Sequence, residues 1–128
     1  MKKQLKSDWY TVDRGPSVDL SEAGIYQWSI EGTGVYIGKA KVLRKRILAY
    51  PRNVRRMLEG KPWHGNPEKN YREIHHALRQ AHDAGTPVIV SVLEVCDPTI
   101  RSERERCWIK LRSRQETEQQ GPRVLNSD

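Results

Sequence analysis

Two short stretches with the composition of β-strands, separated by a glycine-containing turn, constrain the fold more than any other feature of this 128-residue chain. Residues 24–30 alternate in character and are rich in aromatic and β-branched side chains, and residues 35–38 resume the same composition. Residues 31–34 contain two glycines, as tight turns require. The sequence therefore predicts a β-hairpin over residues 24–38.

Apolar residues recur at helical spacing directly after this hairpin. Intervals of three and four residues place them on one face of an amphipathic helix over residues 43–58. This apolar stripe consists of Leu43, Ile47, Tyr50, Val54 and Leu58. Pro51 falls inside the pattern, so it either bends the helix or begins a second segment.

A loop and a second helix are predicted next. Residues 59–68 are rich in Gly, Pro and Asn and carry Trp63 and His64, which indicates a loop. Residues from about 69 to 84 have helical periodicity, and Gly85 is a typical helix terminator. The polar face of this helix is formed by Arg72, His75, His76 and Arg79. The histidine spacing is not that of a metal site, so we interpret this face as solvated.

A strand and a third helix are predicted at the end of the chain. Residues 87–95 form a short, valine-rich run typical of a buried strand. Thr99 is suited to cap a helix over about residues 100–113. The apolar stripe of that helix consists of Ile100, Cys107, Trp108 and Leu111. Residues 1–21 show no clear period and are interpreted as an N-terminal arm, which leaves residues 22–128 as the folded domain.

The order of these elements predicts the fold class. Strand, strand, helix, helix, strand and helix follow one another, and 128 residues are about the size of one compact domain. We therefore expect an α+β domain with a small, mainly antiparallel three-stranded sheet flanked by helices.

Positive charge is concentrated in one part of the sequence. The chain has a net charge of +7, and residues 39–61 hold nine basic residues against one acid. This concentration favours a surface that binds phosphate groups over an ordinary solvated helix face. The nine basic residues are Lys39, Lys41, Arg44, Lys45, Arg46, Arg52, Arg55, Arg56 and Lys61.

The composition predicts a soluble protein without a membrane partner. Mean hydropathy is −0.82, and no apolar run approaches the ~18 residues that a membrane span needs. The basic start is followed by Ser7 and Asp8 instead of an apolar segment, which argues against a secretion signal. Cys96 and Cys107 fit neither a disulfide framework nor a metal motif and are expected to be reduced core thiols. We therefore expect a cytoplasmic location.

Several short motifs stand on these predicted elements. The hairpin strands carry Gly24-Ile25-Tyr26 and Tyr36-Ile37-Gly38. Arg46 follows in the first helix, Glu105 is separated by two residues from a Trp-Ile pair in the last helix, and Asn126 ends a Val-Leu-Asn segment. Each motif alone is weak, but the complete set in this order is hard to obtain by chance. Over about residues 22–126 the chain resembles the GIY-YIG nuclease family.

This resemblance implies a metal-dependent endonuclease that hydrolyses phosphodiester bonds of DNA. Glu105 would hold one Mg²⁺, a hard cation that prefers oxygen ligands, with Mn²⁺ as an alternative ion. Arg46 would contact the scissile phosphate through its planar guanidinium group. Tyr26 would act as general base or position the water, and Tyr36 would hydrogen-bond in the same pocket.

The tyrosine chemistry sets a requirement on such a site. A phenol with a pKa of ~10 is a poor base at neutral pH unless a metal ion or a cation lowers that pKa. Lys39 and Lys45 are the candidates for this role. Tyr50 lies four residues after Arg46, where family members commonly carry histidine and some carry tyrosine, and it is expected in the catalytic site.

Each of these residues also has a structural interpretation. Tyr26 and Tyr36 would fit core positions of their strands. Arg46 lies at the edge of the apolar stripe of its helix, which favours a pocket. Glu103 and Glu105 both border the stripe of the last helix, and only the resemblance selects Glu105. The alternative function is therefore a non-catalytic nucleic-acid-binding module that retains the fold.

DNA, duplex or branched, is the expected partner. The sequence has almost no insertions that would serve as recognition modules, which favours structure-selective or weakly sequence-specific cleavage, in repair or in restriction. Monomer and homodimer are both left open. The residues expected to contact nucleic acid are Lys39, Lys41, Arg44, Lys45, Arg52, Arg55, Arg56, His64 and Asn126.

Overall fold

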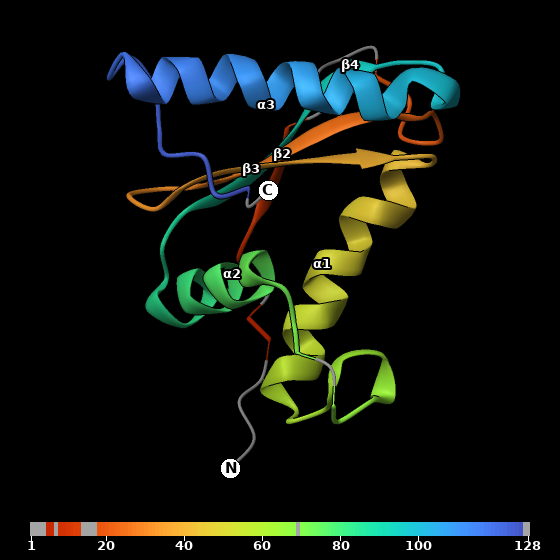
Figure 1. Ribbon diagram of the computed structural model, residues 1–128. Coiled ribbons are helices and arrows are strands. Elements are labelled where there is room, and N and C mark those ends of the chain that lie inside the picture. The colour runs from red at the N-terminus through yellow and green to blue at the C-terminus, as the bar shows by residue number, and fades with distance from the viewer. Residues whose placement is uncertain (1–4, 7, 14–17, 69, 127–128) are drawn as a thin grey trace.

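The computed structural model describes residues 5–6, 8–13, 18–68 and 70–126 (Figure 1). Its strands are β1 (Thr11–Asp13), β2 (Gly24–Ile30), β3 (Gly34–Ala40) and β4 (Val88–Val95). Its α-helices are α1 (Leu43–Leu58), α2 (Glu73–Ala84) and α3 (Arg101–Thr117), and its 3-10 helices are η1 (Trp63–Gly65) and η2 (Pro98–Ile100). The predicted α+β class is confirmed. In this part of the chain no helix combines the length and the apolar composition needed to cross a bilayer.

The sheet has the strand order β1-β4-β2-β3, with β2 antiparallel to both of its neighbours. This arrangement confirms the predicted hairpin. The prediction of three strands is incomplete, because β1 pairs with β4 in parallel and makes the sheet mixed and four-stranded. β1 comes from the predicted irregular arm, parts of which, residues 1–4, 7 and 14–17, lie outside the described residues. With three residues, all exposed, β1 is too short to show a period in the sequence.

Helices cover both faces of the sheet, with α1 and α2 on one side and α3 on the other (Figure 1). Alternate residues of β2 face opposite ways, as the pleat of a strand requires. Tyr26, Trp28 and Ile30 join the core formed with α1 and α2. On the other face, the Gln27 side-chain oxygen accepts a hydrogen bond of 2.8 Å from Arg112 Nε of α3.

The core confirms the apolar stripe predicted for the first helix. All five of its residues are buried. α1 runs through the buried Pro51 without interruption, so no second segment begins there. The exposed sides of α1 carry its basic residues, so that the stretch of positive charge lies on the surface.

α2 begins at Glu73, later than predicted, and ends before Gly85, whose φ of 71° is the left-handed conformation that glycine favours. The prediction of a solvated polar face is wrong for His75, which is only 4% exposed. The rings of Tyr50 and Trp63 enclose it at centroid distances of 5.3 and 5.8 Å. These rings come from other elements, so the periodicity of α2 alone does not reveal the burial.

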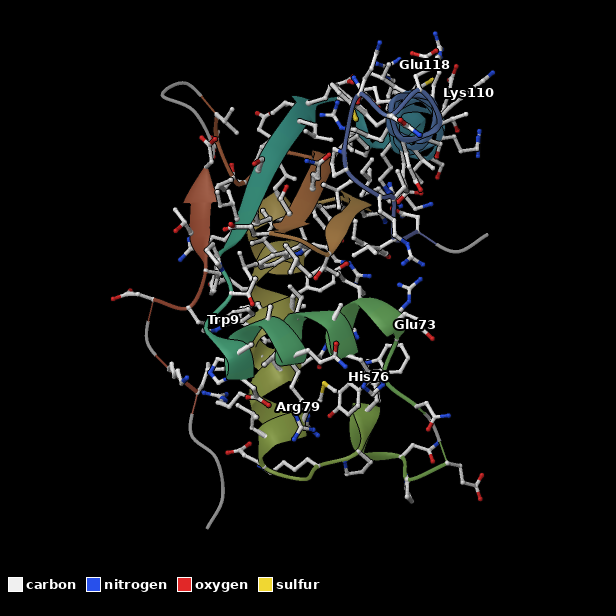
Figure 2. The ribbon with its side chains drawn as sticks, turned by 90° about the vertical axis from the view of Figure 1, so that its left-hand side faces the viewer. Trp9, Glu73, His76, Arg79, Lys110 and Glu118 are labelled. Carbon is white, nitrogen blue, oxygen red and sulfur yellow. The ribbon has the colours of Figure 1, made fainter. Side chains whose placement is uncertain are left out.

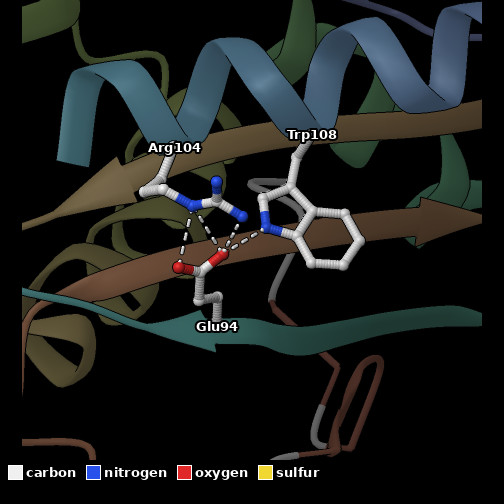
Figure 3. A network of polar contacts seen from close by, with 3 residues as sticks. All are labelled: Glu94, Arg104 and Trp108. Atoms are coloured by element: carbon white, nitrogen blue, oxygen red, sulfur yellow. Dashed lines mark hydrogen bonds and ion pairs between the residues drawn. The ribbon is translucent and has the colours of Figure 1, made fainter. Parts of the chain in front are cut away.

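No residue of α3 is fully buried, and polar contacts join this helix to the sheet. The Glu94 carboxylate on β4 accepts hydrogen bonds from Arg104 Nε at 2.9 and 3.0 Å and from Arg104 Nη2 at 2.8 Å (Figure 3). It also accepts one from the Trp108 indole N–H at 2.9 Å. The predicted apolar stripe is therefore wrong at Ile100 and Leu111, which are exposed.

Three further details near α3 differ from prediction. Thr99 does not cap the helix; its N–H instead donates to the Asp97 carboxylate at 2.9 Å, at the start of η2. The helix continues to Thr117, beyond the predicted end. Both cysteines are free, but Cys96 is half-buried and Cys107 is exposed, so neither is a core thiol.

We expect Glu94→Gln to lower the free energy of unfolding by about 1–2 kcal/mol, since it weakens hydrogen bonds to a charged acceptor that is 25% exposed. The hydrogen bonds from Arg104 lower the pKa of the Glu94 carboxyl. The stabilisation of the fold by the ionised Glu94 carboxyl is therefore complete above the ordinary glutamate pKa. It is lost as the pH falls through the lowered pKa of the folded state. Urea unfolding at neutral and acid pH measures this difference, with exposed Glu103→Gln as control. A loss of unfolding free energy in Glu94→Gln that is as large in acid as at neutral pH would contradict this role of the Glu94 carboxylate.

Candidate active site

A hollow of about 800 Å³ lies where the β2–β3 hairpin, the first turns of α1 and the start of α3 meet. Figure 1 shows that α1 and α3 begin near the same end of the sheet. The hollow gathers side chains that are far apart in the sequence, including four of the five predicted catalytic residues. The predicted site residues on its wall are Tyr26, Tyr36, Lys39, Lys41, Lys45, Arg46 and Glu105.

Tyr26 is fixed by a buried pair of phenols. It is 1% exposed, and its hydroxyl oxygen lies 2.5 Å from that of Tyr50. Gly38 lies so close to the Tyr26 ring that a Cβ atom at position 38 would overlap it. The glycine that ends the second tripeptide is therefore needed to seat the tyrosine that ends the first.

Arg46 and Tyr36 flank this pair. The Arg46 guanidinium carbon lies 5.6 Å from the centroid of the Tyr50 ring, within the range of a cation–π contact. Tyr36 is half-buried, with its ring centroid 6.4 Å from that of Tyr50. Tyr50 itself is buried and lines a neighbouring hollow, so it supports Tyr26 from behind instead of facing the larger hollow.

Burial raises the pKa of the Tyr26 phenol above its ordinary value. The hydrogen bond with Tyr50 and the positive charge of Arg46 oppose this rise without cancelling it. Arg46, and not the two lysines predicted for this role, is the cation that acts on the phenol, and Lys39 Nζ instead donates to Ser102 Oγ at 2.8 Å. Tyr26 therefore carries its proton at neutral pH.

The helical pattern of α3 does not decide whether Glu103 or Glu105 is the site residue, but the structure distinguishes them. Glu105 is half-buried and lines the hollow, whereas Glu103 is exposed outside it. Burial raises the pKa of the Glu105 carboxyl, and the positive charges of Lys39 and Arg72 counteract this rise only in part. Glu105 is the one acidic side chain on this wall among the described residues.

Six basic side chains line the same hollow as this carboxylate. They are Lys39, Lys41, Lys45, Arg46, Arg72 and Arg101. Arg72 and Arg101 were not predicted as site residues, because they precede α2 and begin α3, and only the packing of these helices brings them to the hairpin. No local pattern in the sequence signals them. The excess of positive charge makes the hollow suited to phosphate groups.

The donor set fits a metal ion that shares the phosphate of a substrate. Within the described ranges, no group of three or more His, Cys, Asp or Glu side chains is placed to hold a metal ion. Mg²⁺, however, keeps several waters and is usually bound through one or two carboxylates together with phosphate oxygens. Glu105 supplies one such carboxylate, and a phosphate beside it would also offset the surrounding positive charge.

The other predicted nucleic-acid-binding side chains on α1 and η1 lie outside this hollow. Arg52, Arg56 and His64 line the neighbouring hollow. Arg44 borders a further hollow along α1, and Arg55 is exposed on the same helix. Together they extend the basic surface along the length of α1.

Asn126 is engaged within the fold. Its side-chain oxygen accepts a hydrogen bond from the Ile37 N–H at 2.9 Å, and its nitrogen donates to the Ile37 carbonyl at 2.8 Å. These bonds tie the C-terminal segment to the edge strand next to Tyr36. Its position is therefore structural, and a contact with nucleic acid stays a prediction.

Comparisons with protein-family models, with curated proteins and with solved structures find no match for this chain.

We expect Gly38→Ala to lower the free energy of unfolding by about 1–3 kcal/mol, the usual cost of overpacking, because the new methyl group displaces the Tyr26 ring. Urea unfolding measures the loss. Combined with Tyr26→Ala the same change should be less costly, since the overlap is removed. Strict additivity of the two changes would contradict this packing.

We expect Glu105→Gln to raise the melting temperature at neutral pH. Because burial raises the folded-state pKa of this carboxyl, its ionisation opposes folding above that pKa, and the effect disappears below the ordinary glutamate pKa. Thermal unfolding over a pH series measures the difference. Exposed Glu103→Gln is the matched control and should leave the melting temperature unchanged. A Glu105→Gln variant that melts below wild type at neutral pH would refute the assignment.

Proposed function

We propose that this protein is a Mg²⁺-dependent DNA endonuclease of the GIY-YIG type. The observation that carries the proposal is the convergence of Tyr26, Tyr36, Arg46 and Glu105 on one hollow with a large excess of positive charge. These residues come from two strands and two helices, and they are the residues that the family resemblance selects. The partner is DNA, duplex or branched.

The proposed reaction is hydrolysis of a phosphodiester bond. The oxygen of a water molecule bonds to phosphorus, and the bond from phosphorus to one bridging ester oxygen breaks. The electron pair of that bond stays on the leaving oxygen, which takes up a proton, while the attacking water loses one. The site must therefore orient a water, offset negative charge on the phosphate and assist proton transfer.

Arg46 and Tyr26 have separate roles in this reaction. Arg46 binds the non-bridging phosphate oxygens, for which its planar, permanently charged group is suited. Tyr26 positions the attacking water through its hydroxyl oxygen, because its raised pKa leaves it protonated at neutral pH. Tyr50 fixes the direction of that hydroxyl, and Tyr36 donates a hydrogen bond at the rim of the hollow.

Glu105 holds the metal ion in this proposal. A bound Mg²⁺ or Mn²⁺ would withdraw charge from the phosphate and lower the pKa of a coordinated water. The basic surface along α1 grips backbone phosphates without reading bases, which favours structure-selective or weakly sequence-specific cleavage. We place such an enzyme in DNA repair or restriction, in the cytoplasm.

Two observations favour the alternative of a nucleic-acid-binding module without turnover. Glu105 is a single carboxylate among six basic side chains, and the Tyr26 phenol has a raised pKa. Both functions predict binding to DNA that weakens with salt. Only cleavage distinguishes them.

Incubation of the purified chain with Mg²⁺ and with supercoiled plasmid, duplex, forked and flapped DNA tests the proposal. We expect nicking or cutting, and a loss of at least about 100-fold in Glu105→Ala and Arg46→Ala, because each removes charge stabilisation from the transition state. Glu103→Ala and Lys110→Ala, exposed on α3, are matched controls and should cut like wild type. DNA binding without any cleavage would establish the alternative, whereas full activity of Glu105→Ala would refute the proposed role of Glu105.

A further inference from the structure

A second hollow adjoins the candidate active site and differs from it in chemical character. Its volume is about 320 Å³, within the range of pockets that hold one small ligand. It is formed by α1, η1 and the start of α2, and it shares Arg46 and Arg72 with the larger hollow. A strand that occupied both hollows would pass over these two arginines.

The wall of the second hollow is strongly basic. Its guanidinium groups belong to Arg46, Arg52, Arg56 and Arg72. No acidic side chain lines it among the described residues. One guanidinium group can donate hydrogen bonds to two phosphate oxygens at once, so the wall is suited to a phosphorylated ligand.

Aromatic rings form another part of the wall. The rings of Trp63 and His64 are stacked at a centroid distance of 4.7 Å, and Trp63 is also stacked on Tyr71 at 6.2 Å. His64 is exposed, with a left-handed backbone at a φ of 53°, which is uncommon for a residue other than glycine. Stacked rings beside basic groups are a typical platform for a nucleobase.

Two buried nitrogens in this wall, Trp63 Nε1 and His75 Nδ1, have no hydrogen-bond partner within the described part of the chain. Burial lowers the pKa of His75 to about 4, so its ring is neutral at neutral pH. Its Nε2 lies 3.2 Å from the Asn53 side-chain nitrogen, which can only donate, and the ring proton is therefore on Nδ1. Both atoms are buried, so a ligand would have to displace part of the wall to accept hydrogen bonds from them.

We propose that this hollow binds one unpaired nucleotide of the DNA strand next to the scissile phosphate, with its base against the Trp63–His64 stack and its phosphate on the arginines of the wall. The inference rests on the proposed function and specifies its substrate class. Flaps, forks and single-stranded ends supply an unpaired base, whereas in a continuous duplex the base must first leave its stack. The protein therefore prefers substrates with a single-stranded branch.

Affinity measurements on the Glu105→Ala chain test this preference, because that variant separates binding from cleavage. Fluorescence anisotropy compares a continuous duplex, the same duplex with a single-stranded flap, and a flap series with one abasic residue at successive positions near the junction. We expect the flap to bind about tenfold more tightly than the duplex or better, and an abasic residue at one position to remove that gain.

Substitutions in the aromatic wall should have the same effect as the abasic residue, which is loss of the tighter binding to the flap. Trp63→Leu and His64→Ala remove the gain for the flap, whereas Trp63→Phe retains part of it by keeping a stacking ring. His64 is exposed, so its change preserves the fold. Lys110→Ala, on α3 and away from α2 (Figure 2), is the matched control and should leave both affinities unchanged.

Equal affinity for the flap and its whole abasic series, or an unchanged flap affinity in His64→Ala, would overturn the proposal. Deoxyadenosine monophosphate and inorganic phosphate serve as competitors, and displacement of the flap by the free mononucleotide at equal concentration would show that the hollow holds a free nucleotide instead. The outcome is independent of the plasmid assay. Cleavage can succeed when this site fails, and the flap preference can appear in a chain that never cuts.

Discussion

The Glu94 carboxylate is the contact on which the geometry of the larger hollow depends. A helix is usually fixed on a sheet by apolar burial, at about 25 cal/mol per Å², but α3 has no fully buried residue. The hydrogen bonds from Arg104 and Trp108 to Glu94 add a directional contact to the burial of apolar side chains such as Ile25 and Ile37 in the sheet (Figure 3). Because charged hydrogen bonds are directional, they fix the rotation of α3 about its own axis as well as its location. This rotation turns Glu105 into the hollow and leaves Glu103 in solvent.

Burial and the neighbouring groups have opposite effects on the pKa of the Tyr26 phenol, and the effect of burial is the larger. Removal from water disfavours the phenolate, whereas the Arg46 charge and the Tyr50 hydroxyl favour it. The same burial gives the hydroxyl a fixed direction, since the ring is held between its neighbours and the backbone of Gly38. The site therefore gains a well-positioned oxygen and loses a ready base. In the proposed reaction, proton transfer from water would then depend on an additional positive charge near the phenol, which a substrate-bound metal ion would supply.

Elements whose residue pattern repeats over many positions, or that are marked by a strong turn signal, could be predicted from the sequence. Features that depend on tertiary packing could not. The hairpin and the stripe of α1 depend on local patterns, and both are present. β1 has too few residues for a pattern, and the burial of His75 depends on rings from α1 and η1. Arg72 and Arg101 reach the hollow only because two helices begin beside the hairpin. The apolar stripe expected in α3 fails for the same reason, because polar partners on β4 and β2 hold that helix.

The charge balance of the larger hollow makes the proposed metal site dependent on DNA. The six basic groups on the wall repel a divalent cation, so such an ion gains little from the single carboxylate. A phosphate that enters first reverses this balance and adds oxygen ligands. By linkage, a phosphate that strengthens metal binding is itself bound more tightly, by the same factor, in the presence of the metal. In this proposal the shared residues Arg46 and Arg72 extend the coupling to the second hollow, so that the strand and the metal ion would strengthen each other's binding.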